Sequence, residues 1–243
     1  MRNSVCGSQI IRAGLLCVGI WSLLGVLFGL ARFEQDMNMT TWWRLLFAGV
    51  SPKGRVDPYP LISWYAWMFP GIMGALLYSH RQHSNWRYFV LTRVGYSGRW
   101  LRRILYNGFI WSVSYTWIGL GVYTSLGLLF GVSASGLLPE HVHMCVLSSI
   151  HISAVCIWIM IIGMWLGYTM AIGTFIVVDG ITAIVSGMVY DHSPWLVGSI
   201  GMWSQNSTML LDWCLPLLCL VSAFLLAPVL ARNILEKGKN NYE

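Results

Sequence analysis

Four side chains that could bind a metal ion or transfer a proton are grouped between positions 140 and 151. They are Glu140, His141, His143 and His151. A zinc site needs three or four such ligands that converge on one point. His141 and His143 are two residues apart, a spacing that places side chains on one face of a strand but not of a helix. We therefore predict no metal site and interpret these residues as interfacial histidines, while an enzyme that uses them remains an alternative.

Asp179 is the one acidic residue well inside an apolar stretch of the sequence. A carboxylate in a membrane span costs at least about 2.5 kcal/mol unless it faces a cavity or a partner. Two interpretations follow. Asp179 lines a substrate pathway or a proton relay, or its carboxyl group bonds to a neighbouring hydroxyl such as that of Thr182 or lies close to the outer interface. No Lys or Arg in another apolar stretch offers itself as a counter-ion.

The motifs of common catalytic and nucleotide-binding sites are absent from the sequence. Neither the HExxH motif of zinc proteases nor the GxSxG motif of hydrolases occurs. Residues 49–55 contain two glycines at the spacing of a P-loop, but Arg55 and Val56 stand where a P-loop needs Lys and Ser or Thr. We predict no catalytic residue, no cofactor and no metal on this chain.

The composition is that of a membrane protein. Hydrophobic residues make up 56% of the chain and charged residues only 10%, whereas soluble domains carry about 25% charged residues. The net charge of +6 could attract nucleic acid, but the basic residues flank apolar runs and form no separate patch. We predict a single transmembrane domain over residues 1–243, in contact with lipid and without a nucleic-acid partner.

Apolar stretches of the sequence predict six transmembrane helices. Each is long enough to cross a hydrocarbon core of about 30 Å at about 1.5 Å per residue. The boundary between the fourth and fifth has no charged loop and rests on Gly163, Gly167 and the polar step from Tyr168 to Thr169. The predicted spans are residues 13–31, 61–79, 104–132, 146–167, 168–190 and 213–231.

The distribution of charge predicts the orientation of these spans. Cytoplasmic loops of membrane proteins carry an excess of Lys and Arg. Segments 1–12, 80–103 and 232–243 contain 11 of the 15 basic residues and only two of the nine acidic ones, Glu236 and Glu243. We therefore predict a multi-pass protein of the cell membrane with both termini in the cytoplasm.

The predicted outer segments are rich in aromatic residues. Within residues 32–60, a run of apolar side chains around Arg44 predicts a short helix that lies in the membrane interface, with its tryptophans at the level of the head groups. Residues 191–212 predict either a second interfacial helix or a segment that dips into the membrane. The apolar side chains of the first segment include Trp42, Trp43, Leu45, Leu46 and Phe47.

The inner loop between the second and third predicted spans combines aromatic and basic residues. Four of them recur at helical spacing, which predicts a short amphipathic helix parallel to the membrane. A turn over residues 95–98 and a basic entry to the third span over residues 99–103 follow it. An ordinary positive-inside loop with an aromatic anchor remains an alternative. The four residues are Trp86, Phe89, Val90 and Arg93.

This inner loop resembles the loop between the second and third helices of small ABC-2-type permeases. The similar features are an aromatic helix, the pattern Arg-x-Gly-x-Ser-x-Arg-Trp from Arg93 to Trp100, and a basic entry to the next span. The chain length, the six predicted spans and the turn at residues 193–195 are similar too. In that family the loop is a coupling helix that rests in a groove of a separate ATPase. The corresponding residues here are Trp86, Phe89, Val90, Arg93, Gly95, Ser97, Arg99 and Trp100.

The resemblance implies the membrane subunit of an ATP-driven exporter. Its substrate would be amphiphilic, an antimicrobial peptide in export or self-immunity, and Asp179 would lie on the substrate pathway. ATP and Mg would bind to the partner ATPase, and a second permease copy or a related permease would complete the pathway. Two alternatives are a membrane-embedded enzyme and a membrane protein that sequesters a peptide without transporting it.

Overall fold

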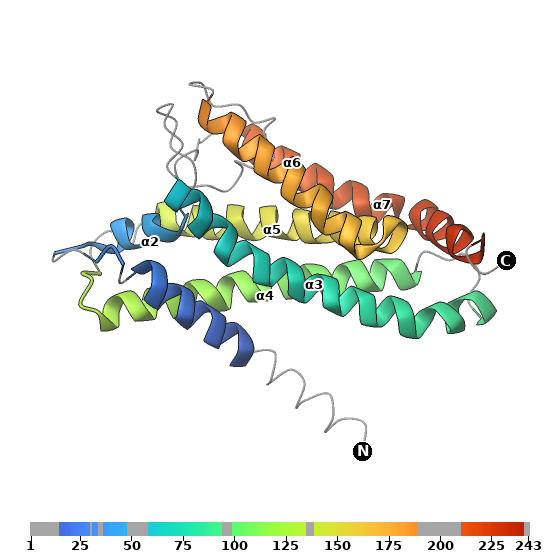
Figure 1. Ribbon diagram of the computed structural model, residues 1–243, viewed down its shortest axis with the longest axis horizontal. Coiled ribbons are helices and arrows are strands. Elements are labelled where there is room, and N and C mark those ends of the chain that lie inside the picture. Colours follow the sequence, from blue (N-terminus) through green and yellow to red (C-terminus); the bar gives the residue numbers. More distant parts are fainter. Residues whose placement is uncertain are drawn as a thin grey trace, which may run out of the picture.

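The elements of the computed structural model are helices, which confirms the predicted all-α class (Figure 1). The structure describes residues 15–29, 31–33, 36–47, 58–93, 99–134, 139–188 and 210–240. A first helix over residues 15–24 continues into the π-helical turn η1 (Gly25–Gly29). The further helices are α2 (Met39–Phe47), α3 (Pro58–Arg93), α4 (Arg99–Leu129), α5 (Pro139–Leu166), α6 (Tyr168–Met188) and α7 (Leu210–Asn240).

Three of the described helices contain a stretch that is long and apolar enough to cross a membrane. Two further apolar stretches, Leu15–Gly29 and Tyr168–Thr182, are shorter. The length and composition of these helices indicate a membrane protein. The three long stretches are Leu61–Arg81 in α3, His141–Leu166 in α5 and Pro216–Ile234 in α7.

The helix α5 lies at the centre of the bundle. It contacts α3, α4, α6 and α7, and 72% of its most apolar stretch is buried, compared with 44% in α3 and 28% in α7. The helices α3 to α7 alternate in direction along the long axis of the molecule (Figure 1). Four of the other described helices therefore meet on α5.

The predicted break between the fourth and fifth apolar stretches is a break between two helices in the structure. The helix α5 ends at Leu166 and α6 begins at Tyr168. The residue between them, Gly167, has a φ of +100°, a conformation that side chains other than glycine rarely adopt. Tyr168 then folds back against Gly163, so that the tight turn leaves α6 antiparallel to α5.

The predicted inner helix is not a separate element. Residues 82–93 are the last turns of α3, which is 36 residues long. The sequence contains no Gly or Pro between Gly74 and Gly95, so nothing ends the helix where the apolar stretch ends. The helix continues beyond Arg81 and ends only at Arg93, where the predicted turn follows.

The predicted outer helix exists, but its tryptophans are buried against other helices of the protein. The helix α2 begins after Asn38, whose side chain accepts a hydrogen bond from the backbone of Thr41 at 2.9 Å and so caps it. Trp42 is fully buried and Trp43 is 4% exposed. The prediction failed because it assigned the apolar face to lipid, whereas that face packs against α3 and α4.

Candidate functional site

The residues predicted to couple to an ATPase extend from the last turns of α3 to the first residues of α4. Arg99 is exposed and Trp100 is buried at the beginning of α4. Gly95 and Ser97 lie outside the described residues. The remaining four belong to the last turns of α3, and their side chains lie outside the described part of the chain: Trp86, Phe89, Val90 and Arg93.

Exposed arginines gather at the end of the bundle that carries this region. The end of α3, the start of α4 and the last turns of α7 lie at the same end of the molecule (Figure 1). This basic end agrees with the side that the charge distribution predicts to be cytoplasmic. Its exposed arginines include Arg81, Arg99, Arg102, Arg103 and Arg232.

Two of the three histidines grouped in the sequence, His141 and His151, have different neighbours in the structure. The ring of His141 meets the edge of Trp43 with 4.8 Å between ring centroids. His151 lies more than two helical turns further along α5, with its ring centroid 6.1 Å from that of Trp64. Within the described ranges, no three His, Cys, Asp or Glu side chains are close enough to hold a metal ion.

Asp179 is buried on α6, with 3% of its surface exposed. The hydroxyl of Tyr65 on α3 donates a hydrogen bond of 2.7 Å to its Oδ2 atom. Thr182, the partner considered from the sequence, donates to the main-chain oxygen of Asp179 at 3.0 Å. The sequence could not reveal Tyr65, because the pairing joins residues 114 positions apart.

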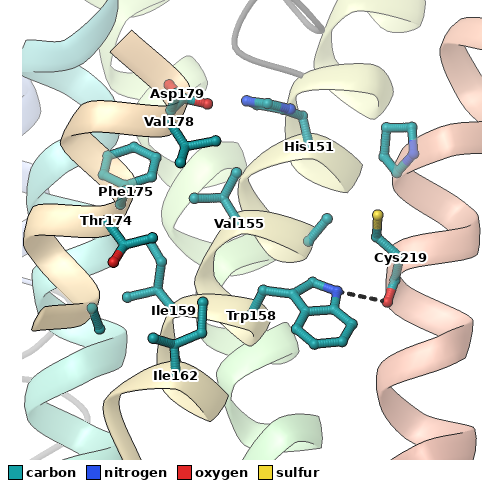
Figure 2. Close-up of a pocket in the computed structure, with 13 residues that line it drawn as sticks. His151, Val155, Trp158, Ile159, Ile162, Thr174, Phe175, Val178, Asp179 and Cys219 are labelled. Atoms are coloured by element: carbon teal, nitrogen blue, oxygen red, sulfur yellow. Dashed lines mark hydrogen bonds between the residues drawn. The ribbon is translucent and has the colours of Figure 1, made fainter. Parts of the chain in front are cut away.

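A cavity of about 210 Å³ lies between α5, α6 and α7, and Asp179 is part of its wall (Figure 2). We call it the Asp179 pocket. His151 and Asp179 lie at the same end, with their polar groups turned toward each other. At the α7 side, the indole of Trp158 donates a hydrogen bond of 3.0 Å to the main-chain oxygen of Cys219. The wall is otherwise mainly apolar and includes Ala154, Val155, Ile159, Ile162, Phe175 and Pro216.

Two polar atoms of residues that line this pocket have no hydrogen-bond partner among the described residues. They are Oδ1 of Asp179 and Nε2 of His151. Buried polar atoms are nearly always bonded, so two unpaired atoms beside one cavity point to a group that can fill it. The sequence signal was present, since each residue interrupts an apolar run, but it did not indicate that the two residues share a pocket.

Comparison with known proteins identifies no relative. No family model, no curated protein and no solved structure matches this chain. The resemblance to ABC-2-type permeases therefore rests on the helical architecture and on the inner-loop pattern from Arg93 to Trp100.

Proposed function

We propose that this chain is the permease subunit of an ATP-driven ABC exporter that moves an amphiphilic substrate, an antimicrobial peptide. The observation that carries the proposal is the length of α3. Its apolar stretch ends at Arg81, and the helix continues for the twelve residues 82–93. At about 1.5 Å per residue this extension is about 18 Å long, enough to project beyond the membrane toward a partner.

The residue types of this extension suit a protein partner. Aromatic and arginine side chains dominate the binding energy of protein interfaces, and the extension carries Trp86, Phe89 and Arg93. The exposed Arg99, Arg102 and Arg103 follow at the start of α4. A rigid helix that continues from the membrane into the partner can transmit a movement of that partner to the span.

The proposed topology has six spans with both termini in the cytoplasm. The alternating directions of α3 to α7 support it, as does the concentration of arginines at one end. The helix α4, one of the proposed spans, contains hydroxyl side chains that bond to carbonyls one turn earlier, as Ser112 does to Gly108 at 2.8 Å and Thr116 to Ser112 at 2.9 Å. Such bonds allow hydroxyls to enter a membrane.

In the proposed mechanism the partner ATPase binds ATP and Mg, and this chain supplies the pathway. A second copy of the permease, or a related permease, would complete that pathway. Closure of the ATPases would move the end of α3 and tilt the spans, which gives alternating access. The low number of charged residues in the spans suits an amphiphilic substrate better than an ion.

The contact with an ATPase is tested by photo-crosslinking from position 89. A photoreactive phenylalanine analogue replaces Phe89, and the crosslinked partner is identified by mass spectrometry from native membranes. We expect a P-loop ATPase. Phe69, which is 40% exposed in the apolar part of the same helix, is the matched control and should yield no such product. Absence of an ATPase from the product at position 89 would contradict the proposal.

Substitutions separate a coupling helix from a loop that only sets topology. We expect Phe89→Ala and Arg93→Lys each to lower transport and ATPase association at least fivefold, because the first removes an anchor and the second keeps the charge but loses the fork of donors. Arg44→Lys, an exposed arginine on α2, is the control. Full transport in both inner variants would show that the segment acts only through its charge.

The topology is tested by cysteine labelling in a background without native cysteines. A membrane-impermeant maleimide added from outside should label cysteines at positions 55 and 205. It should not label cysteines at positions 97 and 238 until the membrane is opened. Labelling of position 97 in intact cells would contradict the proposed orientation.

A further inference from the structure

The Asp179 pocket combines a mainly apolar wall with two buried polar atoms that lack partners. Asp179 is 3% exposed and His151 is 1% exposed. Both side chains are turned into the pocket at the same end (Figure 2). Neither Oδ1 of Asp179 nor Nε2 of His151 has a hydrogen-bond partner in the described structure, so the two atoms do not bond to each other.

Both unpaired atoms can act as hydrogen-bond acceptors. The carboxylate oxygen accepts only, and the imidazole accepts at Nε2 when its proton is on Nδ1. An ammonium head group has three hydrogen-bond donors and no acceptor. It can therefore bond to both atoms at once, and a third donor remains for a further acceptor.

The charge of the pocket also favours a cation. The only hydrogen bond to the carboxylate of Asp179 among the described residues comes from the neutral hydroxyl of Tyr65. No Lys or Arg is among the described residues that line the pocket. A carboxylate surrounded by apolar helices is costly without an opposite charge, and a bound ammonium would supply that charge.

The volume of the pocket sets the size of the ligand. An engineered protein cavity of roughly 150 Å³ admits benzene, and the Asp179 pocket has about 210 Å³. The additional space suits an apolar body of about six carbons together with a small head group. The side chains of Val155, Ile159 and Phe175 would contact the body, while Asp179 and His151 would contact the head.

We propose that the Asp179 pocket is a binding site for a small cationic amphiphile, whose ammonium group lies between Asp179 and His151 and whose apolar body fills the space between α5, α6 and α7. The site belongs to a single chain. It does not depend on an ATPase partner, so its test can fail while the transport proposal stands, and the reverse also holds.

The experiment measures binding of n-hexylamine to the full chain in lipid nanodiscs. An alkylamine resembles the Lys side chain, with a pKa of about 10.4, and is therefore a cation at neutral pH. Equilibrium dialysis of the radiolabelled probe against loaded and empty phosphatidylcholine nanodiscs corrects for partition into lipid. The matched probe n-hexanol has the same chain and a neutral head. We expect saturable binding of one hexylamine per chain and at least tenfold weaker binding of hexanol.

Three variants locate the bound probe. Asp179→Asn keeps the shape but removes the charge, and should weaken hexylamine binding at least tenfold. Asp36→Asn makes the same chemical change outside the pocket, at a position where a φ of 74° also suits Asn, and should leave binding unchanged. Ala154→Val adds bulk to the pocket wall without touching the carboxylate, and should weaken both probes; it carries the test if Asp179→Asn does not fold.

The same head group could come from a free amine or from an amine-bearing lipid. Nanodiscs that contain phosphatidylethanolamine distinguish these sources, because competition with hexylamine would assign the site to the lipid ammonium and unchanged binding would assign it to a free amine. Three results would overturn the proposal: no binding above that of empty nanodiscs, equal binding of hexanol and hexylamine, or hexylamine binding that is unchanged in both Asp179→Asn and Ala154→Val.

Discussion

Two regions of the bundle differ in how completely side chains fill their interior. The aromatic core, made by the first helix, α2, α3 and α4, is filled by large rings. Two of its members pair their polar groups with each other's main chain: Trp42 donates to the main-chain oxygen of Tyr123 at 2.9 Å, and Tyr123 donates to that of Trp42 at 2.9 Å. The Asp179 pocket, between α5, α6 and α7, keeps a cavity and leaves two polar atoms unpaired beside it. The aromatic core comprises Trp21, Trp42, Phe47, Trp67, Tyr115 and Tyr123.

The difference between the two regions is the empty space and not the missing hydrogen bond alone. In the aromatic core the indole nitrogens of Trp21 and Trp67 are also buried without a hydrogen-bond partner in the described structure. Their rings, however, are packed against each other at 5.8 Å between centroids, and such contacts stabilise aromatic pairs by about 0.5–1.5 kcal/mol. The unpaired donors of the aromatic core lie among packed rings, whereas the unpaired atoms of the Asp179 pocket lie beside a cavity, which is the basis of the proposed binding site.

The largest effect is expected when the aromatic core loses a ring. Trp42→Ala should lower the free energy of unfolding by about 3–5 kcal/mol, because it creates a cavity and removes the bond to Tyr123. Unfolding in mixed micelles at rising SDS concentration measures this value. Trp117→Ala, at a position that is 47% exposed on α4, is the control. Similar losses in the two variants would contradict the distinction between a filled core and the rest of the bundle.

Adding volume to the aromatic core should be nearly as harmful. A Cβ atom at Gly119 would overlap the indole of Trp21, and overpacking of this kind costs up to about 3 kcal/mol. Gly119→Val should show this loss in the same SDS titration. Gly121 lies two residues away in the same helix, and a Cβ there would meet nothing within 4 Å. Gly121→Val should therefore leave stability almost unchanged. An equal loss of stability in the two variants would show that helix propensity, and not overlap with Trp21, destabilises Gly119→Val.

The same substitution in the two regions sharpens the comparison. Tyr65→Phe removes the hydroxyl that bonds to the carboxylate of Asp179, whereas Tyr123→Phe removes one that bonds to a main-chain oxygen. Hydrogen bonds to charged groups contribute about 1.5–3 kcal/mol and neutral ones about 1 kcal/mol, so Tyr65→Phe should be the more destabilising. We also expect saturating hexylamine to restore part of the loss in Tyr65→Phe and none in Tyr123→Phe.

The helices could be predicted from the sequence because apolar runs and glycine breaks are local signals. The turn at Gly167 followed from such a signal and was confirmed. The burial of α2 was missed because a face rich in tryptophan suits a lipid interface and a protein core equally well. In the structure, the hydrogen bond from Trp43 to Thr124, 81 residues away, helps to place this helix in the bundle, and no local pattern contains that information.

The site was predictable only in part for the same reason. Asp179 was recognised because a charged residue in an apolar run is unusual. Its partner Tyr65 and its neighbour His151 come from other helices, and only the packing of α3, α5 and α6 brings the three together. His151 had been grouped with His141 and His143 by proximity in the sequence, although it lies in a different environment.

The smallest effect is expected outside the aromatic core, where the guanidinium carbon of Arg32 lies 4.1 Å from the centroid of the Tyr59 ring. Burial raises the pKa of Tyr59 and the charge of Arg32 lowers it. The hydroxyl keeps its proton at neutral pH and donates a hydrogen bond to the main-chain oxygen of Phe28 at 3.0 Å.

A cation over a ring at an exposed site contributes about 0.5–1 kcal/mol. A double-mutant cycle with Arg32→Gln and Tyr59→Leu should therefore give a coupling energy of this size. Tyr59→Phe is the matched control, because it keeps the ring and should retain the coupling while it loses the hydrogen bond. A coupling of zero with Tyr59→Leu would mean that the contact between Arg32 and the Tyr59 ring does not stabilise the protein.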